Sequence, residues 1–288
     1  MSMLDPGAWR VRVLSLSVVA TMAVAAAPTV DGAPPLPFDP RDPALICKGM
    51  NGKIGRSQAL RDLAADFAAN VHLAQAAKAS DVEDELDLFE KLGLMEGHLM
   101  IGKALLDAKM QRDAEPHFGH PISEIYDYIK PVFAERKYPE FDSDLRDLEA
   151  RAKSAPQAPE TTAAYDAVLA KIDGLRRTIP AKLSSSPGFV VRGIALMMEA
   201  SADDLAESFE KGKIANTVEY HDAMGFARYA DKVLAANRAL LGDKAGKIGT
   251  EIQFAMSAFP ALTPPAQAPH TPADLTAAAG RVKELANN

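Results

Sequence analysis

Three of the six histidines in this sequence, His98, His117 and His120, lie in one short part of the chain. Imidazole nitrogens suit zinc, copper and iron, the transition metals that proteins bind most often through histidine. His117 and His120 are three residues apart, so on a helix they share one face. Glu96 and Glu124 flank the three histidines and can add carboxylate oxygens. These residue types predict a transition-metal site, provided that the fold brings His98 to the other two.

The stretch from residue 95 to residue 126 also carries small and large residues at a regular spacing. The four positions are Gly102, Leu105, Ala114 and Phe118. Small residues let two helices approach, while a leucine and an aromatic ring fill the space beside them. The stretch therefore resembles one tetratricopeptide-type helical hairpin, with His98 at the consensus tryptophan and the late proline displaced to Pro121. Such repeats need about three copies to share a core, so the resemblance implies local geometry only.

The hairpin geometry implies where His98 lies. If Gly102 faces Ala114 across an antiparallel helix pair, His98 lies one turn further from the loop, level with Phe118. We therefore predict a metal site for copper, zinc or iron formed by His98, His117, His120, Glu124 and Glu96. Helical bundles hold metal ions through inward-pointing histidine and glutamate in this way.

A structural interpretation of the same histidines stays open. Pro116 and Pro121 interrupt the segment, so His120 can cap a helix and leave the face that His117 occupies. Buried histidines also form hydrogen bonds across interfaces without binding a metal. A second compact group, Glu219, His221 and Asp222, is consistent with an ordinary polar face or with half of another site. Methionines in the apolar stripes are typical core residues.

The elements that must position these side chains are helices. Beyond residue 56, apolar residues recur every three or four positions, and no segment alternates as a strand does. Ser186–Pro187, Asn216 and Thr271–Pro272 are typical helix starts, and Gly242 suits the position after a helix end. We predict an all-α fold of two antiparallel helical bundles joined by a short Pro/Ala linker. The polar C-terminal helix is expected to dock loosely.

Proline-rich stretches divide the predicted chain. The parts are a signal peptide (1–25), an extended lead (26–56), an N-terminal lobe (57–153), a linker (154–160), a C-terminal lobe (161–259), and a tether with a short helix (260–288). Arg10 and Arg12 precede an uncharged run that is too short to span a bilayer, and small residues at 23 and 25 suit signal peptidase. We expect a periplasmic or otherwise exported protein without a membrane span. An uncleaved anchor or a mis-started N-terminus is the alternative.

Composition excludes several classes of function. The formal net charge of −7 disfavours nucleic acid as a partner. One cysteine, Cys47, permits neither an intramolecular disulfide nor a cysteine-based metal cluster. The sequence has no phosphate-binding glycine loop, no Gly-x-Ser-x-Gly, no Cys-x-x-Cys-His and no His-Glu-x-x-His. Nothing in it indicates an enzyme.

Two functions are consistent with these features. An exported protein of two helical bundles with histidine and glutamate between helices resembles the imelysin-like iron-regulated proteins in architecture and compartment. Those proteins carry a Gly-x-His-x-x-Glu element, from which Gly97-His98 and the residues after it depart, so no residue roles are transferred. The first hypothesis is a periplasmic metal-binding protein. The second is a helical adaptor that docks an envelope protein partner or a small apolar ligand between the lobes.

Overall fold

The structure is a computed structural model that describes residues 79–210 and 212–286. The predicted signal peptide, the extended lead and the first helix of the N-terminal lobe lie outside the described residues. Cys47 and His72 lie outside them as well.

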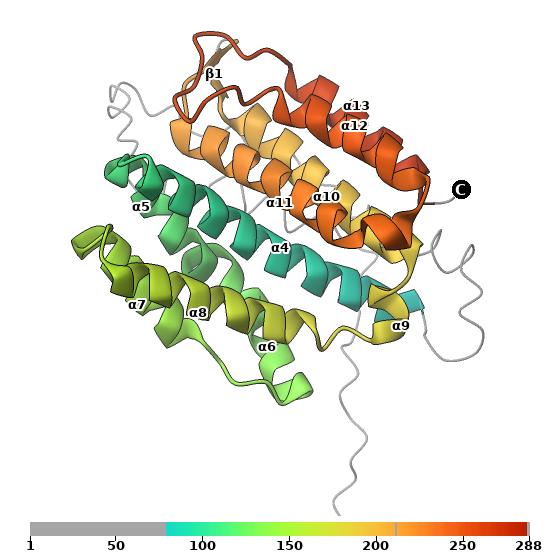
Figure 1. Ribbon diagram of the computed structural model, residues 1–288, viewed down its shortest axis with the longest axis horizontal. Helices are drawn as coiled ribbons and strands as arrows, with labels where there is room; N and C mark the ends of the chain where they lie inside the picture. Colours follow the sequence, from blue (N-terminus) through green and yellow to red (C-terminus); the bar gives the residue numbers. More distant parts are fainter. Residues whose placement is uncertain (1–78, 211, 287–288) are drawn as a thin grey trace, which may run out of the picture. The chain divides into compact units, whose positions relative to one another are not determined.

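Four helices in the second half of the chain form a bundle. They are α10 (Pro187–Glu207), α11 (Thr217–Leu241), α12 (Lys244–Met256) and α13 (Pro272–Glu284). Each contacts two of the others, in the order α10, α11, α12, α13 and back to α10 (Figure 1). This closed ring buries one apolar face of every helix, which is the stable solution for amphipathic helices.

Helix α4 (Ala79–Asp107) lies between this bundle and a second group of helices (Figure 1). It packs on α10 and α11 on one side, and on α5 (Gln111–His120) and α8 (Pro159–Arg176) on the other. Helix α7 (Asp142–Ser154) packs on both α5 and α8. Because α4 is covered on both sides, its side chains are buried almost all the way round, and polar residues on it lie in the interior. Its fully buried apolar residues include Leu86, Leu92, Met95, Leu99 and Leu105.

The remaining elements are short or connect these helices. The π-helix η1 (Pro121–Ile125) and helix α6 (Tyr126–Arg136) follow α5 without a break, and α9 (Ala181–Ser184) precedes α10. Strands β1 (Phe209–Glu210) and β2 (Lys213–Ile214) pair antiparallel between α10 and α11. No strand was expected there; the ladder is two residues long on each side, too short to show an alternating pattern.

The all-α prediction is confirmed. Two of the three predicted caps form side-chain hydrogen bonds: the Asn216 side chain accepts the Val218 N–H, and Thr271 forms a capping box with Asp274. Ser186 lies at the start of α10 as predicted, but its side chain forms no cap hydrogen bond. Within the described part of the chain, no helix has the length and apolarity needed to cross a membrane. The division at residues 154–160 stays a prediction, and α8, α10 and α11, which follow it, all contact α4.

The expectation that the C-terminal helix docks loosely is wrong. Helix α13 packs on α10 and α12 and closes the four-helix ring. Its buried side chains are small or medium apolar residues, Leu275, Ala278, Ala279 and Val282. Three- and four-residue spacing of alanine and leucine is enough for close helix packing even where the average composition is polar.

Candidate metal centre

Two glycines bring helices α4 and α11 together beside His98. A Cβ atom on Gly225 would lie against the carbonyl oxygen of Gly97, closer than atoms can approach, and a Cβ on Gly97 would overlap the ring of Phe226. Only glycine therefore allows the two backbones to touch at this point. His98 follows Gly97 directly, and Asp222 lies one turn before Gly225 on α11, so the close approach places the two side chains face to face.

A third glycine sets the position of helix α5. A Cβ on Gly102 would lie 2.9 Å from the ring of Phe118, so this ring packs directly on the α4 backbone. His117 precedes Phe118 in the sequence, and both are buried. Gly102 and Phe118, two of the four residues in the hairpin pattern, are therefore in contact, and α5 presents its histidines to α4.

The two prolines near the histidines do not break the helix. Pro116 lies inside α5, and Pro121 begins the π-helix η1, in which the Tyr126 N–H donates to the Pro121 carbonyl. A proline lacks the N–H that would continue the helix ladder, and the wider π turn accommodates it. His117 and His120 consequently stay on one face. The alternative in which His120 turns away from His117 is wrong.

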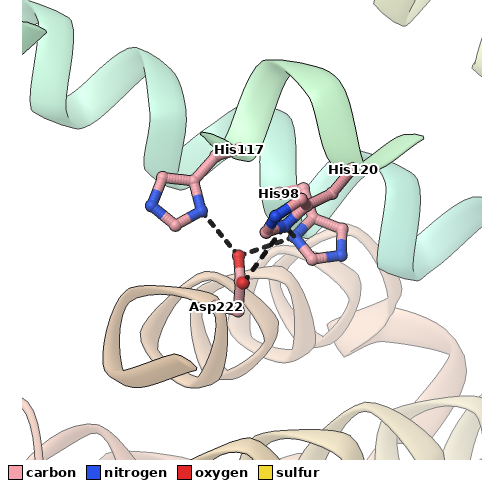
Figure 2. Close-up of side chains that lie close together, drawn as sticks. All are labelled: His98, His117, His120 and Asp222. Atoms are coloured by element: carbon pink, nitrogen blue, oxygen red, sulfur yellow. Dashed lines mark hydrogen bonds and ion pairs between the residues drawn. The ribbon is translucent and has the colours of Figure 1, made fainter. Parts of the chain in front are cut away.

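The three histidines converge on the carboxylate of Asp222 (Figure 2). The Nδ1 atoms of His98 and His117 lie 2.6 and 2.7 Å from Oδ1 of Asp222. Nδ1 of His120 lies 3.3 Å from Oδ2 and 3.4 Å from Nδ1 of His98. We call these four residues the histidine cluster. All four are at most 5% exposed, so solvent water does not screen them.

The protonation of the histidine cluster follows from burial and charge. Burial alone would raise the pKa of Asp222, but the three facing imidazoles hold it well below its ordinary value. Burial would lower the pKa of His120, but the carboxylates of Asp222 and Glu124 outweigh it and raise the pKa to about 9. Burial lowers the pKa of His117 to about 4, and Asp222 offsets this only in part. At neutral pH the cluster therefore combines an ionised carboxylate, a cationic His120 and a neutral His117.

Ring nitrogens on the outer side of the cluster are buried without partners. An ionised carboxylate can only accept hydrogen bonds, so His117 donates its Nδ1–H to Asp222, and its Nε2 carries a lone pair. Among the described residues, Nε2 of His98 and Nε2 of His117 have no hydrogen-bond partner. Figure 2 shows the second ring nitrogen of His117 on the side of the ring away from Asp222. An unpartnered buried polar atom is costly and calls for an explanation.

Two of the separations between the inner atoms of the cluster match those around a tetrahedral ion. With metal–nitrogen bonds of about 2.1 Å, neighbouring ligand atoms lie roughly 3.4 Å apart. The His98–His120 and His120–Asp222 separations, 3.4 and 3.3 Å, already have this length. The two shorter contacts to Asp222 are hydrogen bonds, and they would lengthen by about 0.7 Å if an ion replaced their protons. Three imidazoles and one carboxylate are a donor set for zinc, iron or copper.

Of the two predicted glutamates, Glu124 lies at the cluster and Glu96 does not. Glu124 Oε1 is 3.7 Å from Nε2 of His120, on the outer side of that ring. Glu96 is fully buried on another face of α4, where it pairs with Arg176 and Lys232. We call these three residues the Glu96 network. Glu96 precedes His98 by two residues, which is about 200° of rotation on a helix, so the two side chains leave α4 on nearly opposite faces.

Asp222 is the central residue that sequence reasoning did not place here. Its nearest ligand partner in the chain, His120, is more than a hundred residues away, and no local spacing links them. One signal was available: a glycine beside His98 and a glycine one turn from Asp222 mark surfaces where helices approach closely. Asp222 also belongs to a second group of buried carboxylates, together with Asp204 and Glu219, whose oxygen atoms lie within 4.8 Å of one another.

Part of the chain is similar to a known protein family. Residues 180–288 match the family described as the iron permease-associated 4-helix bundle domain. The matched part contains α10–α13, the closed ring of four helices, and therefore Asp222. The three histidines lie outside it, on α4 and α5. No curated protein and no solved structure matches the chain.

Proposed function

We propose that this protein binds a divalent transition-metal ion, iron in particular, in the histidine cluster. The observation that carries the proposal is the convergence of three Nδ1 atoms on one buried carboxylate, with one ligand atom from each residue within 4.8 Å of the others. The similarity of residues 180–288 to a domain associated with iron permeases favours iron over zinc and copper.

The charge balance of the cluster supports the same proposal. Without a metal, the proton on His120 supplies the positive charge that the buried Asp222 needs. A divalent ion bound by three neutral imidazoles and the carboxylate would replace that proton with a larger charge. Because buried charges must be compensated, the site is arranged to exchange a proton for a metal ion.

Metal binding to the purified protein tests this proposal. Chelator-treated protein would be titrated with Fe²⁺ without oxygen, and separately with Zn²⁺ and Cu²⁺, by equilibrium dialysis and calorimetry. We expect about one equivalent per chain, and loss of this uptake in His117→Ala. His270→Ala is the matched control, since His270 contacts Ser257 and Phe254 far along the chain from the cluster. Uptake well below one equivalent, or equal uptake in both variants, would contradict the proposal.

We also propose that the protein is exported, on the basis of the charged start and uncharged run of residues 1–25. Expression of the full chain in a Gram-negative host, followed by cell fractionation and intact-mass measurement, tests this. The expected product is a periplasmic chain that begins at Ala26. A cytoplasmic chain of full mass would contradict export.

A further inference from the structure

His221 is a buried histidine next to Asp222 that the proposed metal site does not use. Its Nε2 lies 2.7 Å from the carbonyl oxygen of Leu262. A carbonyl oxygen only accepts hydrogen bonds, so Nε2 carries the proton, and in the neutral ring Nδ1 carries a lone pair. That Nδ1 atom is buried and has no partner among the described residues. The structure thus fixes the tautomer of His221 and leaves an unused acceptor in the interior.

The ring of His221 lies against the ring of His117, which also has an unpartnered nitrogen. The ring centroids of His117 and His221 are 5.5 Å apart, with the rings 75° from parallel. Since a ring nitrogen lies roughly 1.1 Å from its centroid, the two nitrogens would come within about 3.3 Å, near hydrogen-bond distance, if the rings turned to face each other. In the metal-free structure neither atom has a hydrogen-bond partner, and two lone-pair nitrogens would not attract each other.

Metal binding changes what His117 offers to His221. If Nδ1 of His117 binds an ion, it loses its proton, and the neutral ring must carry a proton on Nε2 instead. One proton leaves Nδ1 and one is gained at Nε2, so the charge of the ring does not change. The new Nε2–H is a donor that faces the interior and needs an acceptor. Nδ1 of His221 is a suitable acceptor.

We propose that His221 is a positioning residue that accepts a hydrogen bond from Nε2–H of metal-bound His117 and thereby holds this ligand in the metal-binding tautomer. The inference rests on the proposed function. The resulting chain runs from the metal through His117 and His221 to the Leu262 carbonyl, in the loop between α12 and α13. Outer hydrogen bonds of this kind orient metal ligands, and their loss typically lowers metal affinity about 10–100-fold.

Two variants and one control separate this role from a merely structural one. His221→Leu removes both the acceptor and the bond to the loop. His221→Gln can still accept through its amide oxygen while it donates to Leu262. Tyr220→Phe is the control, because the Tyr220 hydroxyl anchors the same loop through the Ala261 carbonyl, 2.8 Å away, but does not provide an acceptor to His117.

The probe is Zn²⁺, which permits NMR of the histidine rings. In the wild-type protein, zinc should shift the His117 Nε2 signal from that of a lone-pair nitrogen to that of a protonated nitrogen. Zinc affinity should fall about 10–100-fold in His221→Leu, fall less in His221→Gln, and stay unchanged in Tyr220→Phe.

The possible failures are distinguishable. A wild-type protein that takes up no zinc overturns the proposed function and this inference together. If zinc binds but His117 Nε2 stays unprotonated, or if His221→Leu binds as tightly as wild type, only the role of His221 is overturned. A second zinc equivalent that disappears in His221→Leu would make His221 a ligand, which also overturns it. If His221→Leu does not fold, the wild-type ring signals and His221→Gln still decide the question.

Discussion

Helix α4 places two charged clusters in the interior, and they differ in the partners of their carboxylates. Glu96, 1% exposed, pairs with Arg176 and Lys232. Asp222, 2% exposed, faces three imidazoles that belong to α4 and α5. Arginine and lysine keep their protons at neutral pH, whereas histidine exchanges its proton near that pH. The Glu96 network is therefore a fixed set of structural ion pairs. The histidine cluster can release a proton when it binds a metal ion.

The Glu96 network should carry more of the folding stability. In Glu96→Gln, the partly buried Arg176 would lose its buried carboxylate partner and keep only the more exposed Asp173, and breaking a pair with a buried carboxylate costs up to about 3 kcal/mol of unfolding free energy. Denaturant unfolding followed by circular dichroism measures this cost. Metal uptake by the folded variant should equal that of the wild type. A variant that keeps its stability but loses metal would reverse the assignment of the two clusters.

The histidine cluster should carry the metal affinity. In Asp222→Asn the only negatively charged ligand is lost at nearly constant volume, so the affinity for Zn²⁺ or Fe²⁺ should fall by at least about 100-fold, more than the range for outer hydrogen bonds. Competition with a chelating dye measures the change. Glu96→Gln is the matched variant, since it also replaces a buried carboxylate by an amide. Similar affinities in the two variants would show that Asp222 is not a ligand.

The close approach of α4 and α11 at Gly97 and Gly225 should be needed both for stability and for the position of the histidine cluster. Gly225→Ala forces a methyl group into the carbonyl of Gly97, where no flexible side chain can yield, so we expect a loss of about 2 kcal/mol in unfolding free energy and weaker metal binding. Gly246→Ala on α12 is the control, because its added Cβ meets no atom within 4 Å. That variant should be neutral or more stable by about 0.5 kcal/mol. Equal thermal unfolding of both would show that the glycine contact does not position the cluster.

Metal binding by the histidine cluster should depend on pH, and the Glu96 network should not contribute to that dependence. His120 must lose a proton to bind through Nδ1, and its pKa in the metal-free protein is about 9. Below that pH the affinity should fall roughly tenfold per pH unit, with about one proton released per ion at pH 7. Calorimetry in buffers of different ionisation enthalpy counts that proton. Glu96→Gln should show the same slope, and a pH-independent affinity between 6 and 8 would contradict the assignment.

The same group affects the stability of the metal-free protein. The pKa of His120 is raised on folding, so its contribution is fully present below its unfolded value of about 6.5 and is lost as the pH rises through 9. The unfolding free energy should therefore decline between pH 6.5 and 9. Bound metal should remove this decline, since His120 then carries no exchangeable proton at Nδ1.

The sequence by itself determined the helices and part of the candidate site. Residues such as Asn216, Thr271 and Gly242 specify helix ends through local hydrogen bonds and backbone preference, so they could be interpreted without a fold. The i, i+3 spacing of His117 and His120 fixed their common face for the same reason. The pairing of Gly102 with Ala114 across one hairpin was enough to predict that His98 lies close to His117 and His120.

Only the tertiary structure decided which carboxylate joins the histidines. Glu96 is two residues from His98 in sequence, yet it lies on another face of the helix and pairs with Arg176. Asp222, on α11, contacts the histidines because Gly97 and Gly225 allow the two helix backbones to touch. Local spacing fixes the direction of a side chain relative to its own helix. The partner that it meets depends on how separate helices pack, and that depends on contacts between residues more than a hundred positions apart.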